Sequence, residues 1–171
     1  MKHALLTTCL ALWSVVLNTA FADTQDELTR AVVGYEVALP KVEAYEAALA
    51  DLVQWAQAHP DDTKLFRDKN TRTSTLDAAA KRLESVPGIK SILDKHRITG
   101  KDMSLMPMAL LSSRAVVMAE KRGITMPPGQ ANAASVAMVR ANDAKVDKLL
   151  ERIMAHLRTL RGSEKENYVN P

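Results

Sequence analysis

The fold is decided by the segment MSLMPMALLSSRAVVMA (residues 103–119), in which Arg114 is the only charged residue. Apolar residues lie at every angle around a helix built from it, which is typical of a helix surrounded by other helices. Thr99-Gly100-Lys101-Asp102 precedes the segment with the pattern of a capping box, and Gly123 follows it as a C-cap. We therefore expect a central apolar helix over residues 103–122.

Helical spacing continues on both sides of this segment. Upstream, apolar residues recur every three or four positions from Asp23 to Ala38, and again from Pro40 until His59-Pro60 stops the pattern. Downstream, residues 132–139 predict a short helix, and a last long helix begins at Asn142 or Asp143 with a clear apolar stripe. These patterns predict helices that bury one face each.

The middle of the chain is less regular. Residues 61–75 are polar and charged and predict an irregular link, whereas Leu76 to Leu83 predicts a short amphipathic helix. Pro87-Gly88 breaks that helix, and the following Ile89-to-Leu93 stretch predicts only another short turn. No stretch alternates as a strand would. The sequence predicts an all-α fold, an irregular bundle of about five or six helices, in a single domain over residues 23–162 with a polar tail over 163–171.

Residues 1–22 have the pattern of an export signal. Lys2 is followed by an apolar run from Leu5 to Leu17, and Ala20-Phe21-Ala22 is a small-x-small cleavage site. We expect cleavage after Ala22 and a mature protein in the periplasm or outside the cell. No later segment approaches the roughly 20 apolar residues of a membrane-spanning helix, so we expect no transmembrane segment in the mature chain.

Composition excludes several classes of function. The single cysteine, Cys9, lies in the predicted signal, which removes thiol catalysis and covalent haem attachment from a cleaved chain. Cleavage removes one of the 23 Lys and Arg residues and none of the 20 Asp and Glu, so the charge stays close to balanced and predicts no nucleic-acid partner. Gly-x-Ser-x-Gly and glycine-rich phosphate loops are absent. These observations disfavour an enzyme.

The order of the segments resembles a group of small exported all-helical bacterial proteins to which no activity is assigned. The resemblance rests on residues 45–60, which end in Ala-His-Pro, on Ile98 to Asp102 opening an apolar helix, and on residues 136–143 with Arg-Ala-Asn. It implies a helical fold and an exported protein, and it implies no catalytic or binding residue.

Methionine gives the sharpest chemical signal. Seven of the eight methionines follow residue 22, and Met103, Met106 and Met108 fall within six residues. Thioether sulfur is a soft ligand suited to Cu(I), so copper is an alternative cofactor, whereas core filling is the ordinary use of methionine. On a continuous helix Met108 points about 200° away from Met106, so the three sulfurs converge only if the helix begins at Pro107.

Histidine offers weaker alternatives. His59, His96 and His156 lie too far apart in sequence to share a helix turn, so a metal site made from them would have to be assembled by the fold. A haem held between one of the methionines and His96 or His156 is a further alternative. The other interpretation is that these histidines lie on solvated or half-buried helix faces and bind no ligand.

Charged residues in apolar surroundings are the remaining candidates. Arg114 must reach water, pair with an acid such as Glu43, Glu46 or Asp102, or bind an anionic ligand. Glu43 and Glu46 are three residues apart and share a helix face, which permits acid–base work only inside a pocket. The sequence predicts a non-enzymatic binding or interaction protein for an unknown protein partner or a small apolar ligand, and it does not fix the oligomeric state. Its signature would be an exposed apolar patch or a lined pocket beside the Met103–Ala119 helix, larger than a monomer normally tolerates.

Overall fold

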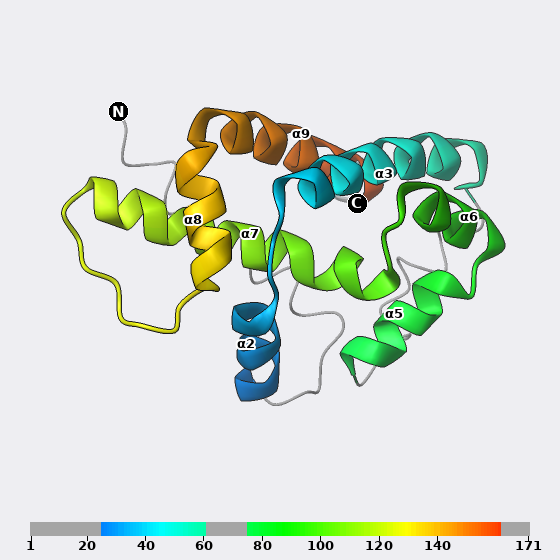
Figure 1. Cartoon of the computed structure of the whole chain (residues 1–171). Helices are drawn as coiled ribbons and strands as arrows, with labels where there is room; N and C mark the ends of the chain where they lie inside the picture. Colours follow the sequence, from blue (N-terminus) through cyan, green and yellow to red (C-terminus); the bar gives the residue numbers. More distant parts are fainter. Residues whose placement is uncertain (1–24, 61–74, 162–171) are drawn as a thin grey trace, which may run out of the picture.

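The computed structural model describes residues 25–60 and 75–161, and these two ranges contain seven α-helices (Figure 1). They are α2 Gln25–Gly34, α3 Leu39–Ala58, α5 Leu76–Glu84, α6 Pro87–His96, α7 Gly100–Lys121, α8 Ala133–Ala141 and α9 Asp143–Arg161. The two described ranges contain no strand. The prediction of an all-helical bundle is confirmed, with seven helices where we expected five or six. The predicted signal, the link except for Thr75, and the predicted tail lie outside the described residues.

The central helix is α7, which contacts α2, α3, α5 and α8. It begins three residues earlier than expected because Thr99 is its N-cap: the Thr99 hydroxyl accepts from the Asp102 amide at 3.1 Å, and the Asp102 carboxylate accepts from the Thr99 amide at 2.9 Å. This pair is the predicted capping box. Helix α7 runs through Pro107 without ending, and its buried residues extend from Gly100 to Val117.

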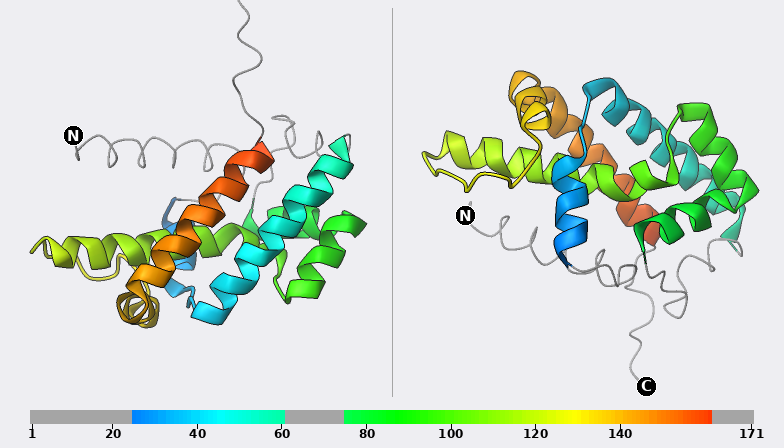
Figure 2. Two further views of the ribbon diagram at one scale, coloured as in Figure 1. Left: turned by 90° about the horizontal axis from the view of Figure 1, so that it is seen from above. Right: turned by 60° about the horizontal axis from the view of Figure 1, so that its bottom comes forward.

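The two other long helices, α3 and α9, lie side by side across α7 (Figure 2). Helix α3 has Pro40 in its first turn, as its position in the sequence predicts. It buries Val42, Tyr45, Ala48, Leu49 and Leu52. Helix α9 buries Val146, Leu149 and Ile153. The apolar stripes predicted for both helices therefore meet in one core, in which α5 and α6 pack near the start of α7 and α8 packs near its end.

The predicted helix from Asp23 to Ala38 is wrong beyond Gly34. Glycine is a poor helix former, and the four residues after it form an extended link. Val37 in this link is 1% exposed, and its backbone amide donates to the Ser135 hydroxyl of α8 at 2.8 Å. The Ser135 hydroxyl on a distant helix thus accepts the hydrogen bond that the Val37 amide would otherwise donate within a helix.

The short turn expected at Ile89 is also wrong, because α6 is a ten-residue helix. Pro87 lies in its first turn, where the missing amide proton has no helical partner to lose. The last residue of the helix is His96, and Arg97 caps it with a left-handed φ of 56°. The Ile98 amide donates to the carbonyl oxygen of Leu93 at 2.9 Å. Burial of Ile89 and Leu93 against the core stabilises a helix too short to form alone.

Candidate functional site

A hollow is lined by residues from the C-terminal end of α7, from the long connection to α8 and from α8 itself. Figure 1 shows this connection between α7 and α8. The volume of the hollow is about 470 Å³. The lining residues are Val116, Glu120, Gly123, Ile124, Thr125, Met126, Pro127, Pro128, Gly129, Gln130, Ala131 and Val136. Most of these side chains are apolar, and Glu120 is the only ionisable one. Val116 is the only one of these lining residues that lies within the apolar segment 103–119.

Local sequence fixes both ends of the connection, which we call the 122–132 loop. At the start, the Gly123 amide donates to Glu120 and the Ile124 amide donates to Ala119, with Gly123 at φ 71°. This is a Schellman motif, and it places glycine just past the end of the helix, as predicted. At the far end, the Asn132 side chain accepts from the Ser135 amide at 3.2 Å and caps α8.

Exposed residues make up most of the lining of the hollow. Ile124 is 52% exposed and is the only large apolar residue in the described part of the chain that is classed as exposed. Gly123 and Gly129 both have positive φ, and a Cβ atom added at either would meet nothing within 4 Å. The Glu120 carboxylate accepts from Arg140 of α8 at 2.9 Å and so is held at one side of the hollow.

The three clustered methionines do not converge on a solvent-facing site. Met106 is 0% exposed and Met108 8%, and both belong to the hydrophobic core, against which the half-buried Met103 packs. Since α7 begins at Gly100 and continues past Pro107, the helix start at Pro107 that would bring the sulfurs together is not observed. This placement favours core filling, the ordinary use of a flexible thioether.

Arg114 is paired, but with other acids than those we expected. Its guanidinium donates to Asp143 and, at 2.6 Å, to Asp147. These two residues are four positions apart and face α7 together, whereas Glu43, Glu46 and Asp102 have other partners. The Arg114 side chain is 13% exposed, so the pairing satisfies a nearly buried cation.

Glu43 and Glu46 share one face of α3, as expected, and that face meets α9. Glu43 pairs with Lys145 at 2.6 Å, and Glu46 pairs with Arg152 at 2.9 Å and lies 3.4 Å from His156. Both carboxylates therefore connect two helices, and neither lines the hollow. Their surroundings give no separation of roles between an acid and a base.

The histidines occupy separate places. His59 stacks on Trp55, His96 contacts Asp51 at 2.7 Å, and His156 contacts Glu46. In the described ranges, no group of three or more His, Cys, Asp or Glu side chains is placed to hold a metal ion. The sequence hypotheses of a three-histidine site and of a methionine–histidine haem site gain no support from these positions.

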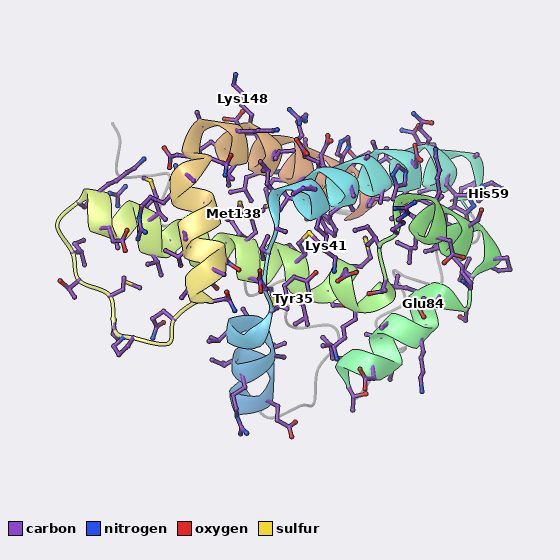
Figure 3. The ribbon with its side chains drawn as sticks, viewed as in Figure 1. Tyr35, Lys41, His59, Glu84, Met138 and Lys148 are labelled. Atoms are coloured by element: carbon purple, nitrogen blue, oxygen red, sulfur yellow. The ribbon has the colours of Figure 1, made fainter. Side chains whose placement is uncertain are left out.

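One polar cluster was not anticipated. Asp102, 5% exposed, accepts from Tyr35 at 2.5 Å and from Lys41 at 2.6 Å in addition to its capping bonds (Figure 3). Burial alone would raise the pKa of Asp102, but the donors Lys41, Tyr35 and Thr99 outweigh it and lower that pKa. Burial, followed by the hydrogen bond to Asp102, raises the pKa of Tyr35. The sequence identified Asp102 as a capping residue but gave no sign of donors more than 60 positions away.

Met126-Pro127-Pro128-Gly129 by itself predicts a turn or linker that cannot continue the central helix. The available signal was the run of Ile124, Met126, Pro127 and Pro128, in a stretch with no acidic residue between Glu120 and Asp143. Such a run predicts a loop, and only the fold shows that its residues line a hollow together with residues of α7 and α8.

Comparisons with known proteins add no relative: no family model, no curated protein and no solved structure matches this chain. Within the described part of the chain, none of the helices combines the length and the apolar character that crossing a membrane would require.

Proposed function

We propose that this protein is an exported, non-enzymatic binding protein that takes an apolar ligand, or an apolar segment of a partner protein, into the hollow beside α7. The observation that carries the proposal is the hollow itself, whose lining includes seven apolar side chains, among them the exposed Ile124. Ligand sites are ordinarily concave, with apolar side chains beside polar groups that fix the orientation of the ligand.

The placement of the ionisable groups supports binding over catalysis. The one ionisable side chain that lines the hollow is Glu120, and Arg140 neutralises it. The other candidates from the sequence, Arg114, Glu43 and Glu46, form ion pairs between helices outside the hollow. General acid–base work needs an acid and a base in reach of one substrate, and Glu120 is the only ionisable side chain among the residues that line the hollow.

The exported location is part of the proposal. It rests on the signal pattern of residues 1–22, with cleavage after Ala22, and on the resemblance to small exported helical proteins. The test is the N-terminal sequence of the protein isolated from the cells that make it. A mature chain beginning at Asp23 is expected, and a chain that retains residues 1–22 would contradict export by this route.

Binding is tested with an apolar fluorophore, anilinonaphthalene sulfonate, added to the folded protein at about 1 µM. We expect saturable fluorescence enhancement that Met126→Glu weakens at least tenfold, because a carboxylate in the lining opposes burial of an apolar ring. Ala137→Glu is the matched control, since Ala137 is exposed on α8 and does not line the hollow.

Helix content by circular dichroism must be equal in all three proteins for the comparison to hold. Equal dye binding by the wild type, Met126→Glu and Ala137→Glu would overturn the hollow as the binding site. The absence of any enhancement in the folded wild type would overturn it as well.

A further inference from the structure

The solvent-facing side of α9 carries a surplus of positive charge. Within residues 143–160 of this helix eight residues are exposed, and none of the eight is a large apolar residue. Four of them are cations, one is an acid, and the other three are alanine or threonine. We call this surface the α9 face, and its residues are Ala144, Lys145, Lys148, Glu151, Arg152, Ala155, Arg158 and Thr159.

The fold produces the surplus by turning the other acids of α9 away from the α9 face. Asp143 and Asp147 lie on the side toward α7, where both pair with Arg114. In sequence these two acids are interspersed among the cations, but in the folded chain Glu151 is the only carboxylate on the α9 face. Four cations therefore share this surface with one acid.

The neighbouring helix α3 pairs with two of the four cations. Glu43 lies 2.6 Å from Lys145, and Glu46 lies 2.9 Å from Arg152. These pairs leave the cations accessible, because the side chain of Lys145 is 55% exposed and that of Arg152 is 52% exposed. Both can therefore still meet an external anion.

The other two cations of the α9 face, Lys148 and Arg158, form no ion pair with any residue in the described ranges. Figure 3 shows the Lys148 side chain directed away from the helix bundle. Because α9 rises about 1.5 Å per residue, the cations from Lys145 to Arg158 are spread along about 20 Å of the helix axis. The α9 face is thus an extended basic surface and does not converge on one point.

We propose that the α9 face binds the surface of an anionic lipid bilayer, with its four cations against the phosphate groups of the lipids. Cations that converge suit a single phosphate or carboxylate, whereas cations spread over an extended face suit a surface that carries many anionic groups. Charge complementarity therefore selects the bilayer. The inference is independent of the hollow, because no residue of the α9 face lines it.

The expected binding is electrostatic and reversible. The α9 face exposes no large apolar side chain that could enter the bilayer, so its charges alone supply the attraction. Each Lys or Arg at an anionic bilayer surface strengthens binding about fivefold, and this attraction is screened by salt. We therefore expect binding that requires anionic lipid and weakens as the salt concentration rises.

Co-sedimentation of the full mature protein with vesicles tests the inference. One set of vesicles contains phosphatidylcholine alone, and the other contains phosphatidylcholine with about 30% phosphatidylglycerol, which supplies the negative surface potential. At about 100 mM salt, where the Debye length is about 10 Å, we expect the protein to sediment only with the anionic vesicles. Raising the salt to about 500 mM should release it.

Charge reversal assigns the binding to the α9 face. Lys148→Glu combined with Arg158→Glu should weaken binding to the anionic vesicles at least tenfold. The matched control is Lys81→Glu combined with Arg122→Glu, which reverses one exposed lysine and one exposed arginine outside α9. It changes the net charge equally and should leave binding within about threefold, because distant charges are screened at this salt concentration. Circular dichroism should show equal helix content in all three proteins.

Three results would overturn the inference. One is the absence of binding to the anionic vesicles at about 20 mM salt, where screening is weak. Another is binding that the two double variants weaken equally, since the attraction would then follow net charge and not the α9 face. The third is binding to poly-glutamate without binding to vesicles, which would replace the bilayer by an acidic polypeptide.

Discussion

At the residue scale, Asp102 connects several parts of the protein through its carboxylate. Its carboxylate caps the central helix through Thr99 and also accepts from Lys41 and Tyr35, so it joins α7 to α3 and to the link that precedes α3. With 5% of its surface exposed, this carboxylate has little access to water and depends on those donors.

Replacement of Asp102 by Asn should therefore destabilise the fold. The amide keeps the shape but removes the charge that faces Lys41, and it cannot accept all of the same hydrogen bonds. We expect a loss of about 2–4 kcal/mol in the free energy of unfolding, measured by urea denaturation at neutral pH. Asp77→Asn is the matched control, because Asp77 is exposed and lies 3.6 Å from Lys101 in a surface pair. An equal loss in both variants would contradict the special role of Asp102.

At the scale of elements, the close approach of α5 and α7 depends on a glycine. A Cβ atom at Gly100, the first residue of α7, would lie 2.5 Å from the carbonyl oxygen of Ala80 in α5. Backbone cannot move aside as a flexible side chain can, so the two helices approach this closely only because residue 100 has no side chain.

Gly100→Ala should destabilise the protein by about 1–3 kcal/mol even though alanine is the better helix former, because the added methyl group separates the helices. The control is Gly34→Ala at the end of α2, where an added Cβ meets nothing within 4 Å. That change should be neutral or stabilising by up to about 1 kcal/mol. Urea denaturation measures the free energy of unfolding of both variants. An unchanged free energy of unfolding in Gly100→Ala would contradict the prediction, because it would show that α5 and α7 can separate without loss of stability.

At the scale of the whole molecule, ion pairs between helices hold the bundle together around its apolar core. Asp51 of α3 accepts from His96 and Lys95 of α6, Asp102 of α7 accepts from Lys41 of α3, and Asp143 of α9 accepts from Lys121 and Arg114 of α7. These partners lower the pKa of each carboxyl from its usual value of 3.8.

The sign of the resulting pH dependence follows from these lowered pKa values. Because each carboxyl binds a proton less readily in the folded chain, its stabilising effect is present above about pH 4 and is lost as pH falls through the lower folded pKa. We expect the melting temperature to fall as pH decreases below about 4, and to fall less steeply in Asp102→Asn. Calorimetry from pH 7 to about pH 2 measures both, and an unchanged melting temperature over that range would contradict the assignment.

The sequence alone determined the features that depend on neighbours along the chain. Apolar spacing predicted the helical class and the central position of residues 103–122, and Thr99, Asp102 and Gly123 predicted caps that the structure contains. Capping and amphipathic spacing act over three or four residues, which is the range that a sequence pattern records.

Only the tertiary structure decided which distant residues meet. It paired Arg114 with Asp143 and Asp147, placed Lys41 on Asp102, ended the first helix at Gly34 and formed a hollow under a loop that reads as an ordinary turn. These outcomes depend on how helix faces pack around a shared core. Several acids could pair with one cation, and the fold decides which of them lies close enough to do so. The hollow therefore depends on the packing of α7 against α8, and no local motif predicts it.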